Sequence, residues 1–175
     1  SLKEAEEIIV TAKKYKKIIF VGHLLNYHNG FINLKERITK NQIGDVICIK
    51  ANRMHFGTIR KYESVIYDLA SHDISMILGI TKTLPKKVSV NALFKKSNNI
   101  ADYLNAILVF DHDITAVINV DWISPYKEHR FSVLGTNGSL IFDDTKDWRE
   151  KLCLNKSIID DELKIINGES TFINL

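Results

Sequence analysis

The sequence has no long apolar stretch and few cysteines, and each shortage excludes a class of protein. No apolar run approaches the roughly 20 residues that a membrane-spanning helix needs, and no secretory signal pattern opens the chain. Cys48 and Cys153 stand far apart in apolar, strand-like surroundings, which argues against a disulfide framework. The six histidines lack tight ligand spacing, which argues against a zinc site. We therefore expect free buried thiols, no bound metal, no membrane partner and a cytoplasmic protein.

A strong excess of charge of either sign is also missing. The 175 residues include 24 Lys and Arg against 21 Asp and Glu, which gives a formal net charge of +3. This balance is compatible with an anionic ligand. No basic run is interleaved with aromatic residues, so nucleic acid is not an expected partner. Hydrophobic residues make up 45% of the chain and charged residues 26%, which is typical of one globular domain, or of one domain plus a fragment.

The first residues have the pattern of a helix followed by a buried strand. Ser1 and Glu4 fit a capping box, and the helix should end in a lysine-rich segment that suits its negative end. The apolar run 18–22 is typical of a strand covered on both faces. Nothing precedes this half of a parallel α/β unit. Residues 1–23 are therefore predicted to be the C-terminal remnant of another domain, and residues 24–175 the main domain.

A second helix and a long strand follow this remnant. The apolar spacing predicts a helix over 30–41, stopped by Gly44. Alternating apolar and polar residues then predict a strand over 45–56. A polar, basic connection over 57–62 leads to the next helix. Loops of this kind carry ligand contacts more often than the elements that they join.

Beyond Pro85 the sequence changes to strands joined by short turns. Strands rich in Val, Ile and Phe are predicted over Lys87–Lys96, Tyr103–Phe110, Ile114–Ile123, Glu128–Gly135 and Ser139–Phe142, with two more near Lys151–Leu154 and Leu163–Ile166. Consecutive strands with such short links are predicted to pair antiparallel. Helices first and a large, mostly antiparallel open sheet second indicate an α+β fold with the helices on one sheet face.

The strand over 114–123 has apolar residues on both of its sides. Val117 and Trp122 are placed on or near the side opposite to Ile114, Ala116, Ile118 and Val120. A broad sheet face with exposed apolar residues usually meets another surface. We therefore expect a homo-oligomer that forms through this face.

The stretch Glu63–Leu78 has the pattern of a small catalytic site. In a helix, Asp68 and His72 stand four residues apart on one face, and apolar residues from Leu69 onward can anchor that helix in the core. A carboxylate can position a hydroxyl and an imidazole can move its proton, because the pKa of histidine lies near neutrality. The same spacing fits a structural histidine bonded to a nearby helix carboxylate. By spacing alone this structural role is the commoner case.

Several segments resemble the Gfo/Idh/MocA oxidoreductases, which are NAD(P)-dependent enzymes that act on sugars, inositols and sugar nucleotides. Residues 1–7 followed by Phe20-Val21-Gly22-His23 resemble the last helix and strand of the family's dinucleotide-binding domain, and residues 34–46 resemble the start of its second domain. The most specific match is Asp68-Leu69-Ala70-Ser71-His72-Asp73-Ile74, together with Asn52-Arg53, Gly57 and Arg60; it is similar to the family's Asp-x-x-x-His helix. The resemblance runs from Ser1 to about Asp144.

The resemblance and the side-chain chemistry suggest roles for five residues. By resemblance, His72 would assist proton transfer at a substrate hydroxyl while hydride passes to the nicotinamide, and Asp68 would bind that hydroxyl and orient His72. Arg60 and Arg53 could bind a phosphate or carboxylate of the substrate, because guanidinium suits bidentate recognition. Otherwise Arg60 is an exposed loop residue and Arg53 a strand-surface residue. Tyr27 faces the cleft by resemblance, or else is a half-buried core aromatic.

The departures from the family pattern concern the cofactor. The glycine-rich phosphate-binding turn is missing, and so is the Glu-Lys-Pro stretch that would lie just before Ser1. After Gly22-His23 the family's Arg-Phe/Tyr-Asn-Pro is replaced by Asn26-Tyr27-His28-Asn29, and the family's closing helices have no counterpart before the chain ends at Leu175. The chain therefore resembles the substrate half of an enzyme. NAD or NADP would bind the full-length enzyme, and none is expected on this chain.

These observations predict the substrate-binding and oligomerisation part of an NAD(P)-dependent oxidoreductase, inactive by itself, for a sugar, a polyol or a sugar nucleotide. Two alternatives stay open. One is a non-catalytic, self-associating module with an unused cleft. The other is a regulatory domain that binds a ligand without chemistry, for which binding should survive His72→Ala better than Asp68→Ala.

Overall fold

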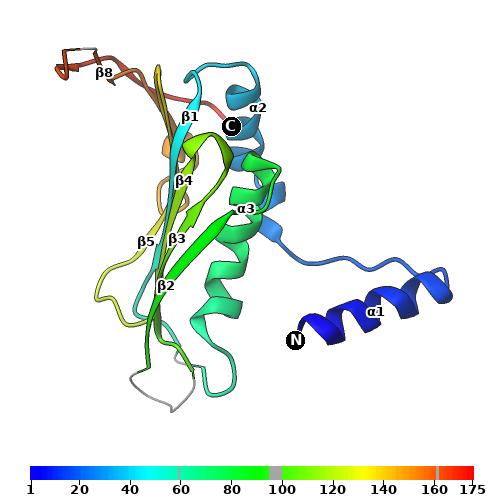
Figure 1. Ribbon diagram of the computed structural model, residues 1–175. Coiled ribbons are helices and arrows are strands. Elements are labelled where there is room, and N and C mark those ends of the chain that lie inside the picture. Colours follow the sequence, from blue (N-terminus) through cyan, green and yellow to red (C-terminus); the bar gives the residue numbers. More distant parts are fainter. Residues whose placement is uncertain (59, 95–99, 161) are drawn as a thin grey trace.

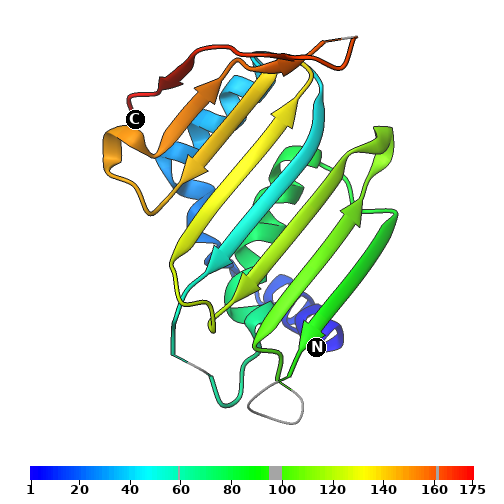
Figure 2. The ribbon, with the colours of Figure 1, turned by 90° about the vertical axis from the view of Figure 1, so that its left-hand side faces the viewer.

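One open sheet with helices on a single face forms the body of the protein (Figures 1 and 2). The computed structural model describes residues 1–58, 60–94, 100–160 and 162–175. The eight strands of the sheet stand in the order β10 (Ser170–Phe172), β7 (Leu152–Asn155), β6 (Gly138–Asp143), β5 (Glu128–Gly135), β1 (Val46–Met54), β4 (Thr115–Asp121), β3 (Tyr103–Val109) and β2 (Lys87–Leu93). The predicted α+β class is confirmed. The predicted end of β2 at Lys96 lies outside the described residues.

One strand from early in the chain is inserted between two later ones. β1 pairs in parallel with β4 and antiparallel with β5, and all other pairs of the main sheet are antiparallel. The prediction that consecutive strands pair was therefore wrong for β4 and β5. The link 122–127 spans up to about 20 Å, whereas skipping one strand position requires only about 10 Å. A short link thus does not force its two strands to be neighbours.

Two helices cover one face of the sheet, and each contributes side chains to the core. Phe31 and Leu34 on α2 (Asn29–Thr39) and Met76 and Ile77 on α3 (Ser71–Thr81) are fully buried. The strands meet them with alternate residues, because successive side chains of a strand point to opposite faces. These inward residues include Ile49, Ala51, Leu104, Ala106, Ala116, Ile118, Val120, Phe131, Val133 and Leu140.

Trp122 belongs to this core. Its side chain is buried, and its indole Nε1 donates to Oδ1 of Asp102 at 2.9 Å. The placement of Trp122 on or near the outer side was therefore wrong. It shares the parity of Ile118 and Val120, which both point to the helices.

The N-terminal segment projects from this body (Figure 1). Helix α1 (Leu2–Lys14) has the predicted capping box of Ser1 and Glu4, but it buries none of its residues. The strand predicted over 18–22 was wrong: these residues pair with no strand, and Ile18 is 97% exposed. A parallel strand needs a neighbouring strand for its backbone hydrogen bonds, and the described residues provide none here. A 3-10 turn, η1 (Leu24–Tyr27), returns the chain to the body.

The C-terminal residues add strands of two kinds. The two strands predicted near 151–154 and 163–166 are confirmed as β7 and β9. However, β9 (Ile165–Ile166) pairs with β8 (Ile158–Ile159) in a separate hairpin, and β10 stands at one end of the main sheet. Short 3-10 turns, η3 (Asp111–Asp113) and η4 (Trp148–Glu150), connect neighbouring strands.

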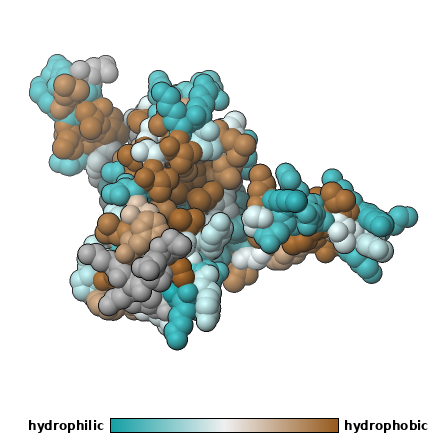
Figure 3. Space-filling model, turned by 60° about the horizontal axis from the view of Figure 1, so that its bottom comes forward, coloured by the Kyte–Doolittle hydropathy of each residue, from teal (hydrophilic) through white to brown (hydrophobic). Residues whose placement is uncertain are grey.

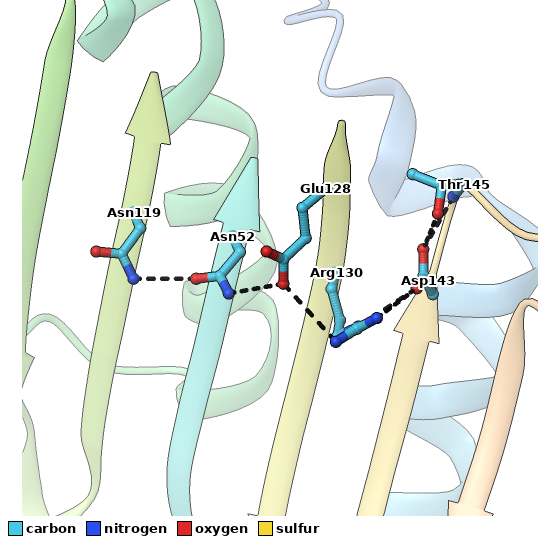
Figure 4. A network of polar contacts seen from close by, with 6 residues as sticks. All are labelled: Asn52, Asn119, Glu128, Arg130, Asp143 and Thr145. Carbon is cyan, nitrogen blue, oxygen red and sulfur yellow. Dashed lines mark hydrogen bonds and ion pairs between the residues drawn. The ribbon is translucent and has the colours of Figure 1, made fainter. Parts of the chain in front are cut away.

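The sheet face opposite the helices carries a belt of polar side chains (Figure 4). Asn119 on β4 donates from Nδ2 to Oδ1 of Asn52 on β1 at 3.0 Å, and Asn52 donates to Glu128 on β5 at 2.9 Å. Arg130 on β5 then binds Asp143 on β6, with Nη2 and Oδ2 3.1 Å apart. The register places Asn119 opposite Asn52, Asn52 opposite Arg130, and Arg130 opposite Asp143, so the belt crosses four strands. We call this side of the sheet the outer face.

Candidate functional site

The helix that carries the predicted pair begins with a wide turn. Ile66–Ala70 (η2) is π-helical, and α3 continues from it to Thr81. Ser64 opens the segment, because its Oγ accepts from the N–H of Ile66 and its carbonyl oxygen from the N–H of Asp68. The helix predicted over 63–78 is thus confirmed, shifted by about three residues. π-turns inside helices are frequent at functional sites.

The core holds this helix in place. Ile77 is fully buried, and Leu69, Ile74 and Leu78 are partly buried against the core. The helix ends at Lys82, whose left-handed backbone (φ 58°) returns its N–H to the carbonyl of Leu78. The backbone under Asp68 and His72 is therefore anchored, as the apolar spacing predicted.

Asp68 is paired with an arginine from the preceding loop. Nε of Arg60 lies 3.5 Å from Oδ2 of Asp68, and the Arg60 side chain is 50% exposed. An ion pair this exposed contributes at most about 1 kcal/mol to stability. The structure thus brings two of the predicted site residues together and leaves the guanidinium open to solvent.

His72 has a half-buried ring among charged neighbours. The ring meets that of His23 edge-on, with centroids 5.8 Å apart, and its Nδ1 is buried with no hydrogen-bond partner among the described residues. Burial lowers the pKa of His72, and the charges of Arg53 and His23 lower it further, against the opposing effect of Asp73 and Asp68. The ring is therefore neutral at pH 7. This is the state in which an imidazole accepts a proton.

The predicted contact between Asp68 and His72 is electrostatic. Within the described ranges no hydrogen bond joins the carboxylate to the ring, while the charge of Asp68 acts to raise the pKa of His72. In the apo state of an enzyme, hydrogen bonds of a catalytic pair are often long and tighten only when substrate binds. In this structure the carboxylate of Asp68 is paired with Arg60 rather than with the ring of His72.

Arg53 holds the strand β1 to the helix α3. Its Nε donates to Oδ2 of Asp73 at 3.0 Å and its Nη2 to Oδ1 at 2.8 Å, in a bidentate pair that is 11% and 3% exposed. Arg53 therefore lies under the helix rather than on an open strand surface. The residue after His72 is thereby fixed to the sheet.

Tyr27 lies at the edge of the same helix. The neighbouring Asn26 donates from Nδ2 to Oγ of Ser75 at 3.0 Å, which ties η1 to α3. The ring of Tyr27 is 62% exposed and packs only loosely, 5.8 Å from the ring of Phe20. It is therefore not a core aromatic.

Sequence reasoning missed a second pair of histidines. The rings of His55 and His129 meet edge-on at 5.6 Å, and Nδ1 of His55 and Nε2 of His129 are buried without hydrogen-bond partners in the part that the structure describes. Burial, followed by the charges of Arg53, Lys127 and His55, lowers the pKa of His129 to about 4. His129 stands opposite Arg53 in the β1–β5 register. The sequence does not predict that β1 pairs with β5, because the two strands are far apart in the chain, and so it does not predict these contacts of His129.

The described residues do not form a site for a metal or a dinucleotide. No group of three or more His, Cys, Asp or Glu among them could hold a metal ion. Residues 1–23 provide one helix and an unpaired extended segment, whereas a dinucleotide site needs parallel strands and a glycine-rich turn. No helix in the described ranges has the length and apolar character to span a membrane.

Comparison with known proteins identifies the kind of domain. Residues 31–141 match the family profile described as the GFO/IDH/MocA C-terminal domain. The fold is thus that of the C-terminal domain of an oxidoreductase. The chain belongs to the Gfo/Idh/MocA family. Comparison with curated proteins gives no match.

Solved structures share this fold across nearly the whole chain. An inositol dehydrogenase homolog from Azotobacter vinelandii, complexed with NADH and myo-inositol, is 14% identical with a TM-score of 0.78, covering 95% of this chain and 47% of that one. The UDP-N-acetylglucosamine 3-dehydrogenase GnnA from Acidithiobacillus ferrooxidans is 17% identical with a TM-score of 0.76, covering 100% and 52%. An aldose-aldose oxidoreductase from Caulobacter crescentus, complexed with glycerol, is 13% identical with a TM-score of 0.79, covering 99% and 52%. The chain thus spans about half the length of the structures that it matches.

Proposed function

We propose that this chain is the substrate-binding and oligomerisation part of an NAD(P)-dependent oxidoreductase that acts on a sugar, a polyol or a sugar nucleotide by hydride transfer. The observation that carries the proposal is the environment of His72. Its neutral ring, with an unpartnered buried Nδ1, stands beside the carboxylate of Asp68 on a helix that the core fixes. The substrates named for the matched structures, which include myo-inositol and a UDP-sugar, suggest the substrate class.

Asp68 and His72 have different proposed roles at a substrate hydroxyl. The carboxylate of Asp68 accepts a hydrogen bond from the hydroxyl and orients it. The neutral ring of His72 takes the proton when the hydroxyl is oxidised and returns it in the reverse direction. Its lowered pKa suits this role, because the ring must be unprotonated before it can act as a base.

Two arginines and a tyrosine complete the proposed substrate surface. Arg60 presents an exposed guanidinium next to Asp68, where it can bind a phosphate or carboxylate of the substrate. Tyr27 offers an exposed ring at the neighbouring edge of the helix. Arg53 uses two nitrogens for Asp73, and Nη1 is the donor that remains for a substrate oxygen.

NAD or NADP is assigned to a domain outside this chain. The cofactor supplies the hydride acceptor or donor, and the chain as given is inactive in hydride transfer without it. Residues 1–23 are proposed to be the end of that domain, and residues 24–175 the substrate domain. The support is that α1 buries no residue and that the apolar residues of 18–21 are exposed. A reducing, cytoplasmic compartment suits the two free cysteines.

The outer face of the sheet is the proposed surface for self-association. It carries apolar side chains, among them Ile107 and Val117, around the polar belt of Asn119 and Asn52. Amide groups both donate and accept hydrogen bonds, so a row of them can pair with a second copy of itself.

The test uses the full-length gene product and a matched set of histidine variants. His72→Asn and Asp68→Asn should lower kcat by at least about 100-fold with the preferred polyol or sugar nucleotide, the typical contribution of a positioned acid or base. His112→Asn, in an exposed turn, is the control and should change nothing. Equal activity in His72→Asn and His112→Asn would refute the proposed role of His72. Ligand binding without turnover by the full-length protein would favour the regulatory domain instead.

A further inference from the structure

A hairpin arm projects from one end of the sheet, on the side away from the helices (Figure 1). We define the arm as β8, β9 and their connection, residues 157–160 and 162–167. Its base is tightly held: the N–H of Lys156 donates to the carbonyl of Glu169, and the N–H of Gly168 to Oγ of Ser157 at 3.1 Å. A Cβ on Gly168 would lie 2.3 Å from the backbone of Lys156, so only glycine fits here. The base therefore fixes the direction of the arm.

The arm exposes large aliphatic side chains along its length. Ile159, Leu163, Ile165 and Ile166 are 68%, 86%, 70% and 49% exposed. The space-filling view shows this apolar surface on the projecting lobe at the upper left (Figure 3). An isolated two-stranded hairpin is at best marginally stable in water, and contiguous exposed apolar surface marks a contact site. These side chains need a partner surface.

A recess lies between the arm and the outer face of the sheet. Its volume is about 920 Å³, and its walls are Ile47, Cys48 and Leu134–Ser139 on the sheet side and Ser157–Asp160 with Ile165 on the arm side. The recess opens onto the outer face, because Cys48 and Leu134 stand in the strand positions that alternate with the buried Ile49 and Val133. The arm and the proposed self-association face thus form one continuous surface.

The size of this surface suits a second copy of the chain. Eight strands about 4.8 Å apart and about six or seven residues long cover roughly 800 Å², which is what one partner contributes to a standard interface. A two-fold dimer requires a surface that complements itself. The protein provides two candidate parts: exposed aliphatic side chains on the arm, and a recess whose lining includes Ile47, Cys48 and Leu134.

We propose that the arm is an exchange element of the homodimer, in which the arm of each subunit packs into the recess of the other. The inference rests on the proposed self-association through the outer face. Beyond that proposal, it names the arm residues that contact the partner subunit: Ile159, Leu163 and Ile165.

The first experiment measures the dimer dissociation constant of the full chain by analytical ultracentrifugation. Ile159→Ser and Ile165→Ser should each weaken the dimer about tenfold or more, since each change removes a large apolar side chain from the proposed interface. Val88→Ser and Val90→Ser are matched controls. These valines are 58% and 54% exposed and point to the opposite side of the edge strand β2, so they should leave the constant unchanged.

Variants of the sheet separate the two proposals. Ile107→Arg and Val117→Arg lie on the outer face away from the arm, and both should abolish the dimer. If the wild type is a monomer at about 100 µM, or if these two variants leave the dimer dissociation constant unchanged, self-association through the outer face is refuted. The arm exchange, which rests on it, is then refuted too. If the Arg variants abolish the dimer but the arm variants leave its dissociation constant unchanged, as the valine controls do, only the arm exchange is overturned. Circular dichroism and thermal unfolding confirm that each variant is folded.

A disulfide trap tests the placement of the arm. In a Cys153→Ser background, Leu163→Cys puts a thiol near the tip of the arm, and Cys48 lines the recess. Mild oxidation should give a covalent dimer through Cys48 of the partner subunit on non-reducing gels. The band should be lost when Cys48→Ser is added. A product that remains monomeric on these gels would overturn the exchange.

Discussion

Replacing Arg53 with methionine should destabilise the protein strongly, because it breaks a buried ion pair. The side chain of Asp73 is 3% exposed and that of Arg53 11% exposed, so the carboxylate left behind is neither paired nor solvated. Removing one partner of such a pair costs about 3–5 kcal/mol. For a chain of this length, each kcal/mol lowers Tm by about 2–4 °C, so the expected decrease is about 6–20 °C. Met preserves most of the apolar volume of the arginine stem.

The double variant Arg53→Met/Asp73→Leu provides the control. With both charges removed, the free energy of unfolding should return to within about 1–2 kcal/mol of the wild type, because apolar residues often replace a buried pair without loss. Urea unfolding of the four proteins gives the coupling energy. The pKa of His72, followed by NMR, should rise in Arg53→Met, since the guanidinium charge that lowers it is gone. A single variant that costs less than about 1 kcal/mol, or additive effects of the two changes, would refute the reasoning.

Three further predictions concern groups outside this pair. The free energy of unfolding should rise between about pH 4 and 6.5, because in this range the unfolded state binds a proton at His129 and the native state, with the pKa lowered to about 4, does not. Because the ring is partly solvated, the expected contribution is about 1–2 kcal/mol. In His129→Gln, the midpoint of urea unfolding should depend less on pH over this range. Trp122→Phe should cost about 1–3 kcal/mol through the lost bond to Asp102, while Trp148→Phe, at an exposed position, should cost under about 1 kcal/mol; equal losses in thermal scans would contradict this. Arg60→Ala should change the free energy of unfolding by less than about 1 kcal/mol but weaken binding of a nucleotide sugar in calorimetry, and a large stability loss would assign Arg60 a structural role.

The local elements were predictable because they depend on neighbours in the sequence. The capping box of Ser1 and Glu4, the strand around Val46–Met54 and the turn at Asn137 and Gly138 are all confirmed. Each follows from a spacing or from turn chemistry that spans only a few residues. The strand over 18–22 failed for the opposite reason. Its apolar run is local, but a strand exists only where another strand supplies hydrogen bonds.

The candidate site divides in the same way. The spacing of Asp68 and His72 placed both on one anchored helix, and the family pattern made them candidates. The partner of Arg53 was not predictable, because Asp73 reaches it only after α3 has packed on β1. His129 became its neighbour through the pairing of β1 with β5, two strands that are distant in the sequence.

By itself, the sequence determined the order of the elements, the α+β class, the membership of the Gfo/Idh/MocA family and the helix of Asp68 and His72. These depend on residue spacing along the chain, which the sequence states directly. Only the tertiary structure decided that β1 is inserted between β4 and β5. It also decided that His72 is partly buried and lies near Arg53 of β1, and burial first and the Arg53 charge second lower the pKa of His72. Only the tertiary structure also set the β8–β9 arm apart from the main sheet. The insertion of β1 and the separate arm are matters of which strands meet, and that choice is made by the packing of the whole domain rather than by any segment of it.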